Sequence, residues 1–342
     1  MQHVTRRALL LGGALALGAA GAGGPALADA AARGTDRDRT AERSAFVRLG
    51  DPAPFVDIGA LAARTTMQDL VLVPENGWLF VSQAVAGSND SSETTVINRV
   101  RVSDGVLLDS MQLVDGGHGL GFEVQLRSGQ PWVWMTWHGS DDDVVRLRYV
   151  PGSYRYAEAD DRLGLERIAF QHKEGRDREA VYHFDAAGQV AVERHFHFSA
   201  GAEATSETYY RRSVSALLTG SSTSRGSVTL PATPPTVQGF ATVGDSLFRL
   251  VGATATNGVQ DARDPMAIEQ HSWTTGRLVA KRQYPDLARD GDARWKDGII
   301  EPQGLGVRRT ADGGISLLLG ATTGGTGRRE HQVLEIPTTG SA

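Results

Sequence analysis

Four segments of the chain share one pattern, in which a polar residue precedes an apolar strand, a turn and a second apolar strand. The segments begin at Gln68, His118, Gln238 and Gln303. Hairpins that recur about every fifty to sixty residues, here with one wider gap, are typical of a β-propeller. The innermost strands of a propeller surround a central channel, so the first residues of equivalent strands lie close together. The repeat therefore predicts a fold and also a site, at the channel mouth where these strands begin.

Nearly all of the remaining pattern is also β, and it predicts a single all-β domain. We expect a five-bladed β-propeller with four-stranded antiparallel blades around the channel. The blades are placed at Thr66–Leu113, Val114–Tyr156, Ala157–Ala200, Thr236–Tyr284 and Ile299–Pro337. Outer hairpins of blades are expected at Val96–Leu108, Ala180–Glu193 and Ala267–Val279.

Three further segments complete this prediction. The third blade is the least regular, and its inner strand is placed at Leu165–Phe170. The early strand Ala45–Leu49 is expected to pair with the last blade, because such closure removes an exposed sheet edge. Gly220–Pro235, rich in Gly, Ser, Thr and Pro, is interpreted as a loop between blades. A linker between two domains is the competing interpretation, but neither half would have enough blades to close alone.

The N-terminus has the features of a secretory signal peptide. Arg6 and Arg7 precede a short apolar stretch, which ends in the small-residue cleavage pattern Ala26-Leu27-Ala28. The paired arginines favour the twin-arginine route. The stretch is rich in Gly and Ala, which disfavours a transmembrane anchor. We expect a cleaved signal at residues 1–28, a disordered lead at 29–43 and the propeller at 44–342, in a protein that is secreted or associated with the cell wall.

The composition excludes several classes of function. The chain has no cysteine, which excludes disulfides and thiolate chemistry. Its formal net charge is −5, and removal of a signal with two arginines and no acidic residue leaves −7. This balance argues against a nucleic-acid binder that relies on phosphate contacts. No second apolar run is long enough to cross a bilayer, so we predict no membrane association after cleavage of the signal. We also predict that the protein binds no nucleic acid and is a monomer.

A resemblance to a known family rests on three motifs in order. They are Gly116-Gly117-His118-Gly119 after Leu107–Met111, Gln238-Gly239-Phe240, and Glu301-Pro302-Gln303-Gly304-Leu305. Together they resemble the propellers of teichoic acid biosynthesis protein C-like proteins, helveticin J-type bacteriocins and certain tailed-phage receptor-binding proteins. The resemblance covers about Thr66 to Pro337. It implies a five-bladed propeller associated with Gram-positive cell-wall glycopolymers, and it implies no particular reaction.

The candidate ligand-binding residues are those predicted to ring the channel mouth. They are Gln68, Asp69, His118, Asp161, Gln238 and Gln303, with Asp161 or its neighbour Asp160 placed at the otherwise missing fifth position. Amides, an imidazole and carboxylates could bind sugar hydroxyls, glycerol or ribitol units and phosphate. Equally, these side chains could bind one another and trapped water and so close the channel.

The same residues leave open whether the protein is an enzyme. His118, flanked by glycines, could act as a general acid or base. Glu301 with Asp69 or Asp161 could form a carboxyl pair for glycoside hydrolysis. We expect recognition of an anionic, teichoic acid-like wall polymer, with a glycosidase or phosphodiesterase that uses His118 or Glu301 as the alternative. No cofactor or metal is predicted; calcium at the acidic loop 138–143 is unsupported, because the spaced ligands of a known calcium loop are missing.

Overall fold

A computed structural model describes residues 47–85, 93–137, 143–168, 181–185, 188–198, 204–221, 223–231, 237–252, 266–284, 301–323 and 329–339. The chain divides into two units, Met1–Ala41 and Glu42–Ala342, and every described residue belongs to the second. The predicted signal peptide at 1–28 and the lead at 29–43 lie outside the described residues.

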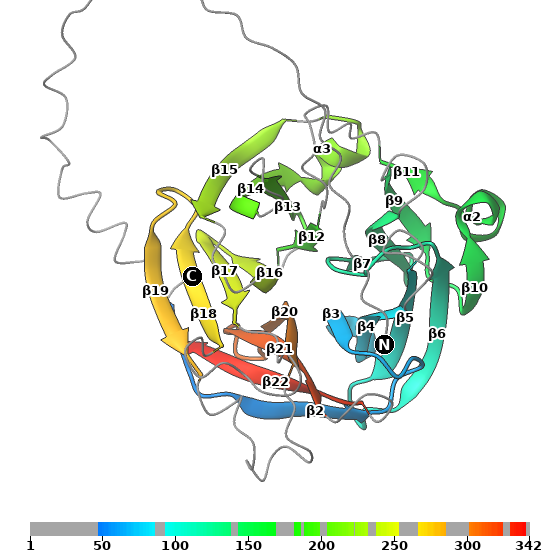
Figure 1. The fold of residues 1–342 in the computed structure, drawn as a ribbon, viewed down its shortest axis with the longest axis horizontal. Helices are drawn as coiled ribbons and strands as arrows, with labels where there is room; N and C mark the ends of the chain where they lie inside the picture. The colour runs from blue at the N-terminus through cyan, green and yellow to red at the C-terminus, as the bar shows by residue number, and fades with distance from the viewer. Residues whose placement is uncertain are drawn as a thin grey trace, which may run out of the picture. The chain divides into compact units, whose positions relative to one another are not determined.

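The described strands form five sheets arranged in a ring, so the predicted five-bladed β-propeller is confirmed (Figure 1). Blade one contains β3 (Met67–Val73), β4 (Trp78–Val85), β5 (Thr94–Arg101) and β6 (Leu107–Val114). Blade two contains β7 (Glu123–Arg127), β8 (Gln130–Trp137), β9 (Asp143–Arg148) and β11 (Glu166–Arg167). Blade three contains β12 (Val181–Phe184), β13 (Val190–Phe198), β14 (Ala204–Ser213) and β15 (Ser224–Pro231). Blade four contains β16 (Val237–Val243), β17 (Ser246–Val251), β18 (Ala267–Ser272) and β19 (Leu278–Gln283).

Blade five joins the two ends of the described chain. It contains β20 (Glu301–Arg309), β21 (Ile315–Thr323) and β22 (Glu330–Thr339). Its outer position is shared by β1 (Arg48–Leu49) and β2 (Ala53–Gly59), which both pair antiparallel with β22. The expected closure of the ring by an early strand is therefore confirmed. Closure covers an edge of β22 that would otherwise be exposed.

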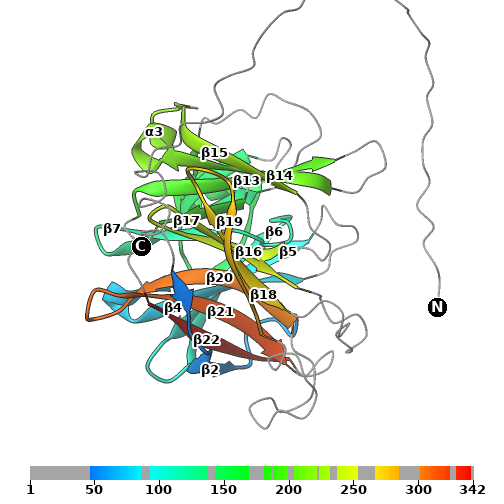
Figure 2. The ribbon, with the colours of Figure 1, turned by 90° about the vertical axis from the view of Figure 1, so that its left-hand side faces the viewer.

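The first strand of each blade lies at the channel, and the last lies at the perimeter. From the side, β19 is seen as the outer strand of blade four, in front of β18 (Figure 2). Short helical elements connect strands: η1 (Pro74–Asn76), α2 (Tyr156–Leu163) and α3 (Val214–Leu218). No described helix has the length and apolar character needed to cross a bilayer.

The hydrophobic core consists of layers between neighbouring blades. Inner and middle strands are covered on both faces, so β21 is buried along almost its whole length, whereas the more exposed β19 contains Lys281 and Arg282. Each layer joins one pair of blades. Representative pairs, from the boundary of blades one and two around to that of five and one, are Phe80 with Trp137, Trp134 with Ala191, Tyr209 with Leu247, Phe248 with Leu317, and Leu70 with Leu318.

Blades two and three differ from the prediction. The segment predicted as the inner strand of blade three contributes Glu166–Arg167, the outer strand of blade two. The hairpin predicted as an outer one at Ala180–Glu193 is instead the inner hairpin, β12 and β13. The predicted loop Gly220–Pro235 contains β15, the outer strand of blade three.

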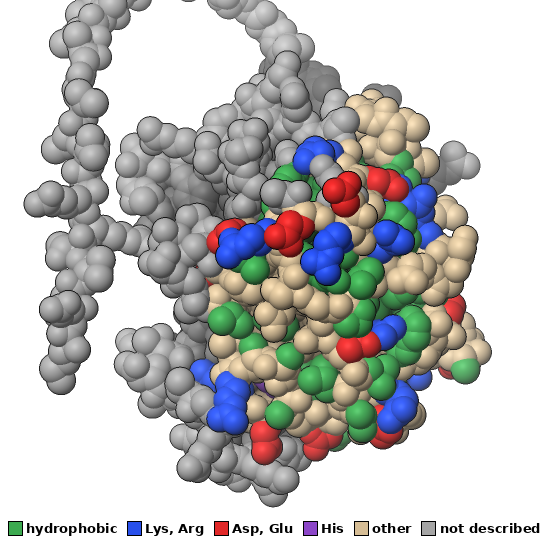
Figure 3. All heavy atoms as spheres, turned by 90° about the vertical axis from the view of Figure 1, so that its right-hand side faces the viewer, with side chains coloured by type: hydrophobic (Ala, Val, Ile, Leu, Met, Phe, Trp, Pro, Cys, Tyr) green, Lys and Arg blue, Asp and Glu red, His purple; other side chains and the backbone are tan. Residues whose placement is uncertain are grey.

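One connection between blades one and two was also missed. β10 (Gly152–Arg155), predicted as part of blade two, leaves that blade and pairs in parallel with β6 of blade one. α2 follows it and leads back to β11. Around β6, β10 and α2, the outer face shows acidic, basic and apolar side chains mixed together (Figure 3). The charges on this face do not form a patch of a single sign.

Candidate functional site

Three inner strands begin with a β-bulge at glutamine. The register of β3, β16 and β20 shifts at Gln68, at Gln238 and at Gln303-Gly304, respectively. A bulge adds one unpaired residue and redirects its side chain. The three glutamines are all buried. The repeated Gln signature therefore marks a local backbone irregularity that blades one, four and five share.

The next residues along the inner strands meet one another across the channel. Asp69 of β3 lies 3.2 Å from His183 of β12, measured from Oδ2 to Nε2. Glu123 of β7 accepts a hydrogen bond from the backbone amide of Phe184, at 2.7 Å. These contacts join blade one to blade three and blade two to blade three. The group of Asp69, Glu123 and His183 is called the carboxylate–histidine cluster below.

Glycines supply the corresponding positions in blades four and five. A Cβ on Gly304 would lie 2.8 Å from the Cα of Asp69, and one on Gly239 would lie 2.8 Å from the backbone nitrogen of Leu305. Real Cβ atoms do not approach backbone so closely, so only glycine fits at either position. The inner strands of blades one, five and four consequently pack backbone against backbone at the level of the cluster.

The cluster is buried, and burial determines how it ionises. Asp69, Glu123 and His183 are 2%, 7% and 5% exposed. Desolvation raises the pKa of Glu123 to about 7, against the opposing effects of His183 and of two backbone amides. Burial alone would lower the pKa of His183, but the neighbouring Asp69 and the charge of Glu123 outweigh it and raise that pKa. The raised pKa favours the protonated form of His183 beside Asp69.

Backbone amides fix both carboxyl groups of the cluster. The Oε1 atom of Glu123 accepts from the amide of Val124 at 2.9 Å, while Oε2 accepts from Phe184. In the same way, Oδ1 of Asp69 accepts from the amide of Leu70 at 2.8 Å. The matching geometry of Asp69 and Glu123 shows that they occupy equivalent positions in blades one and two.

On the side where the inner strands begin, little space adjoins the cluster. Gln68, Gln238, Asp69 and His183 line a space of about 10 Å³, as formed by the described residues. That is about the minimum that one water molecule needs. The alternative in which these side chains close the channel thus matches the described geometry, with Asp69 and His183 as the central contact.

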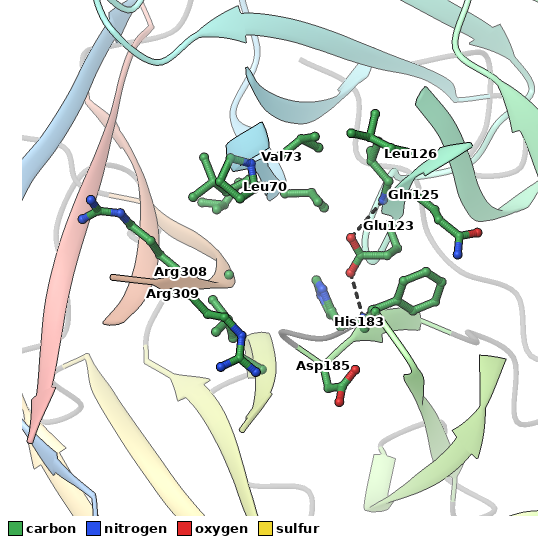
Figure 4. Close-up of a pocket in the computed structure, with 18 of the residues that line it drawn as sticks. Leu70, Val73, Glu123, Gln125, Leu126, His183, Asp185, Arg308 and Arg309 are labelled. Carbon is green, nitrogen blue, oxygen red and sulfur yellow. Dashed lines mark hydrogen bonds between the residues drawn. The ribbon is translucent and has the colours of Figure 1, made fainter. Parts of the chain in front are cut away.

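A larger cavity lies on the opposite side of the cluster, toward the ends of the inner strands. Its volume is about 380 Å³, and all five inner strands contribute to its wall. The apolar part includes Leu70, Val73 and Leu126, and the floor includes Glu123 and His183 (Figure 4). Each inner strand ends the order of its sheet, so one of its backbone edges has no partner among the described strands. Such an edge presents both donors and acceptors.

Charged side chains lie along the wall and rim of this cavity. Arg308 and Arg309 of β20 lie on one side, and Glu123, His183 and Asp185 lie on the other (Figure 4). Arg308 is anchored by Glu335, whose Oε1 accepts from its Nη1 at 2.6 Å. Arg309 is exposed. The cavity therefore combines guanidinium groups, carboxyl groups, backbone edges and an apolar wall.

The structure brings together part of the predicted ring. Gln68, Asp69 and Gln238 line one small space, and Gln303 lies on β20, the strand that contacts both β3 and β16. No ligand contact tests these residues, which stay predictions as binding residues. No three His, Asp or Glu side chains of the described ranges are placed to hold a metal, and the prediction of no cofactor also stays untested.

The other predicted residues are His118, Asp161 with its alternative Asp160, and Glu301. His118 is exposed, five residues before β7, where its Nδ1 lies 2.8 Å from Oε2 of Glu93. The expectation that it starts an inner strand is wrong, because Glu123 does so. Asp161 lies exposed on α2, outside blade two, so it does not fill the fifth ring position; Asp160 lies on the same helix. Glu301 begins β20, but its side chain lies outside the described residues. Residues 138–142 of the acidic loop 138–143 also lie outside them.

Sequence reasoning missed Glu123 and His183. Both follow an aromatic or apolar residue in a short apolar run, Phe122-Glu123-Val124 and Tyr182-His183-Phe184. The sequence contains a signal for both residues: each is titratable and stands inside an apolar run that must be buried on both faces. Such residues require a partner in the fold.

A family model identifies the family to which the chain belongs. A model of the family described as phage 5-bladed beta propeller receptor binding platform domain matches residues 66–335. The chain belongs to this family. The match supports the phage receptor-binding part of the resemblance seen in the sequence, while the teichoic acid biosynthesis protein C-like and helveticin J-type names stay predictions. No curated protein matches the chain.

The solved structures with a similar fold include a phage tail fiber. The tail fiber of Staphylococcus aureus phage P68 has a TM-score of 0.70 and 21% identity, over 89% of this chain and 56% of the tail fiber chain. This receptor-binding domain thus spans about half the length of that protein, and the likeness concerns the fold. A thermostable family-43 glycoside hydrolase has a TM-score of 0.44 and 10% identity, over 83% of this chain and 96% of the other. We draw nothing from that weaker likeness.

Proposed function

We propose that the protein is an extracellular receptor-binding module that recognises an anionic cell-wall glycopolymer of the teichoic acid type. The proposed site is the channel cavity of about 380 Å³, a volume within the range of roughly 300–1,000 Å³ usual for ligand pockets. The observation that carries the proposal is that all five blades of a receptor-binding propeller converge on this cavity.

The lining of the cavity suits such a polymer. Unpaired backbone edges offer donors and acceptors to the hydroxyl groups of sugars or alditols. Apolar side chains such as Leu70 and Leu126 suit the C–H faces of the same units. The exposed guanidinium of Arg309 adds a positive charge at the rim, which attracts phosphate. Together these groups match alternating polyol and phosphate chemistry.

Hydrolysis is the weaker alternative. Glu123 has a pKa raised by burial to about 7, the range of a general acid. However, backbone amides occupy both of its oxygens, and its contact with Phe184 links two blades. We therefore assign Glu123 a structural role, in which it links blades two and three. His118, the acid or base candidate from the sequence, lies before β7, at the opposite end of the strand from the cavity.

A charge reversal at the rim tests the binding site. Arg309→Glu should weaken co-sedimentation with purified Gram-positive walls by about tenfold or more, since a hydrogen bond to a charged group contributes about 1.5–3 kcal/mol. Arg225→Glu is the matched control, because Arg225 is also exposed but lies on β15 at the perimeter. Equal binding by the two variants would place the site outside the cavity.

Two further measurements separate the alternatives. Loss of binding in the double variant His118→Ala with Gln303→Ala, but not in Arg309→Glu, would move the site to the end where the inner strands begin. Release of sugar or phosphate fragments from walls by the wild type would establish the hydrolase.

Export and oligomeric state are part of the same proposal. We expect the secreted protein to begin at Asp29, after removal of the twin-arginine signal, and to be a monomer. N-terminal sequencing and light scattering measure both. An intact N-terminus on the exported protein, or a trimer, would contradict these expectations.

A further inference from the structure

The channel cavity has a floor at the carboxylate–histidine cluster. His183 lines the cavity on one side and the space of about 10 Å³ on the other. Its ring packs edge-on against the fully buried Phe240, with centroids 4.7 Å apart, and its Nε2 lies 3.2 Å from Asp69. A side chain fixed between an aromatic ring and a carboxylate leaves no passage at this point.

The rest of the floor is closed by backbone. Gly304 lies so close to Asp69, and Gly239 so close to Gly304 and Leu305, that even a methyl group would collide with main-chain atoms. Blades one, five and four therefore seal their arc of the channel, and Glu123 with His183 seals the arc of blades two and three. Among the described residues, this floor lies between the cavity and the small space where the inner strands begin.

We infer that the cavity receives the free end of a polymer chain and not an internal stretch of it. This inference rests on the proposed function and specifies how the polymer is engaged. A polymer bound by an internal stretch needs an entrance and an exit, and the floor removes the second opening. The volume of about 380 Å³, near the lower limit for ligand pockets, suits one or a few terminal units.

End recognition also explains the position of the charges. The terminal unit lies nearest the floor, and a chain end has hydroxyl groups there that an internal unit has lost to its links. Glu123 and His183 are held by partners of their own and give the floor its polar surface. Arg309 lies at the rim, where the first phosphates beyond that unit would pass. A polymer whose terminal unit is an uncharged polyol, followed by phosphate, matches a cavity with polar groups at its floor and a guanidinium at its rim.

The stoichiometry of binding tests the inference. Synthetic poly(glycerol phosphate) and poly(ribitol phosphate) chains that differ only in length are titrated into the wild-type protein by calorimetry. We expect one protein per chain at every length, with an affinity that stays constant once the chain exceeds the cavity. A number of bound proteins that grows in proportion to chain length would overturn the inference.

Blocking the ends gives a second, independent readout. A bulky group is attached to one end of the bound oligomer or to the other. We expect one modification to reduce affinity at least tenfold and the other to leave it unchanged. Full affinity for both modified oligomers would overturn end recognition.

Failure of the inference is distinguishable from failure of the proposed function. Binding that scales with chain length, or full affinity for both end-blocked oligomers, overturns end recognition while wall recognition stands. Absence of binding to walls and to both synthetic chains overturns the proposed function and this inference with it.

Discussion

The ionisation of Glu123 predicts how stability depends on pH. The pKa of this carboxyl is raised from 4.5 to about 7 by burial. The folded state therefore keeps a proton that the unfolded state has lost between these two values, so the free energy of unfolding decreases as pH rises through that interval. The full effect is about 3 kcal/mol, because one pKa unit corresponds to about 1.36 kcal/mol.

Glu123→Gln removes this ionisation and keeps the size of the side chain. Below about pH 5 the variant should be less stable than the wild type by about 1–3 kcal/mol, because one amide of Val124 or Phe184 then faces an NH₂ group. Between about pH 5 and pH 8 the wild type should lose about 2–3 kcal/mol relative to the variant. The two curves should therefore converge or cross.

Urea unfolding of both proteins across this range measures the difference. All other titrating groups are common to the two proteins, so the change in their difference isolates position 123 and its effect on His183. Glu123→Asp, which restores an ionisable carboxyl, should recover part of the slope. A constant difference between wild type and Glu123→Gln from about pH 5 to pH 8 would refute the role assigned to the buried carboxyl.

Three other perturbations follow from the geometry of the ring. Phe240→Ala should lower the free energy of unfolding by about 3–5 kcal/mol, since the ring is fully buried between two other rings; a loss in urea unfolding below about 1 kcal/mol would contradict this. Gly304→Ala should lower Tm more than the control Gly313→Ala, because both have positive φ but only Gly304 faces backbone; equal losses would argue against the seal. Deletion of residues 1–59 removes both closing strands and should give aggregates in size-exclusion chromatography, whereas deletion of residues 1–41 should leave a folded ring; a folded product in both cases would show that closure is dispensable.

The fold was predictable because three blades begin with the same local structure, a glutamine at a β-bulge. Gln68, Gln238 and Gln303 each precede a strand at a bulge, and Gly239 and Gly304 permit the close backbone contact that follows. Sequence repeats preserve such backbone requirements, so the blade count and the ring closure could be predicted. One end of the channel could also be identified, because the repeated residues mark where the inner strands begin.

The interior of blades two and three could not be placed in the same way. A short hairpin such as Val181–Glu193 has the same alternation whether it lies at the channel or at the perimeter, because this depends on which neighbours cover it. Glu123 and His183 take part in the site through partners on other blades, and those contacts have no fixed spacing in sequence. The sequence thus indicated the closed end of the channel, while the cavity depends on packing among all five blades.

Photo-crosslinking is the most direct measurement of where the polymer binds. A ribitol phosphate oligomer with a photoreactive group near its end is bound, irradiated and mapped by mass spectrometry. We predict crosslinks in the peptides that line the cavity, Leu70–Glu75 and Leu305–Arg309. Crosslinks confined to the segment around His118, at the other end of the channel, or to the outer strands would contradict it.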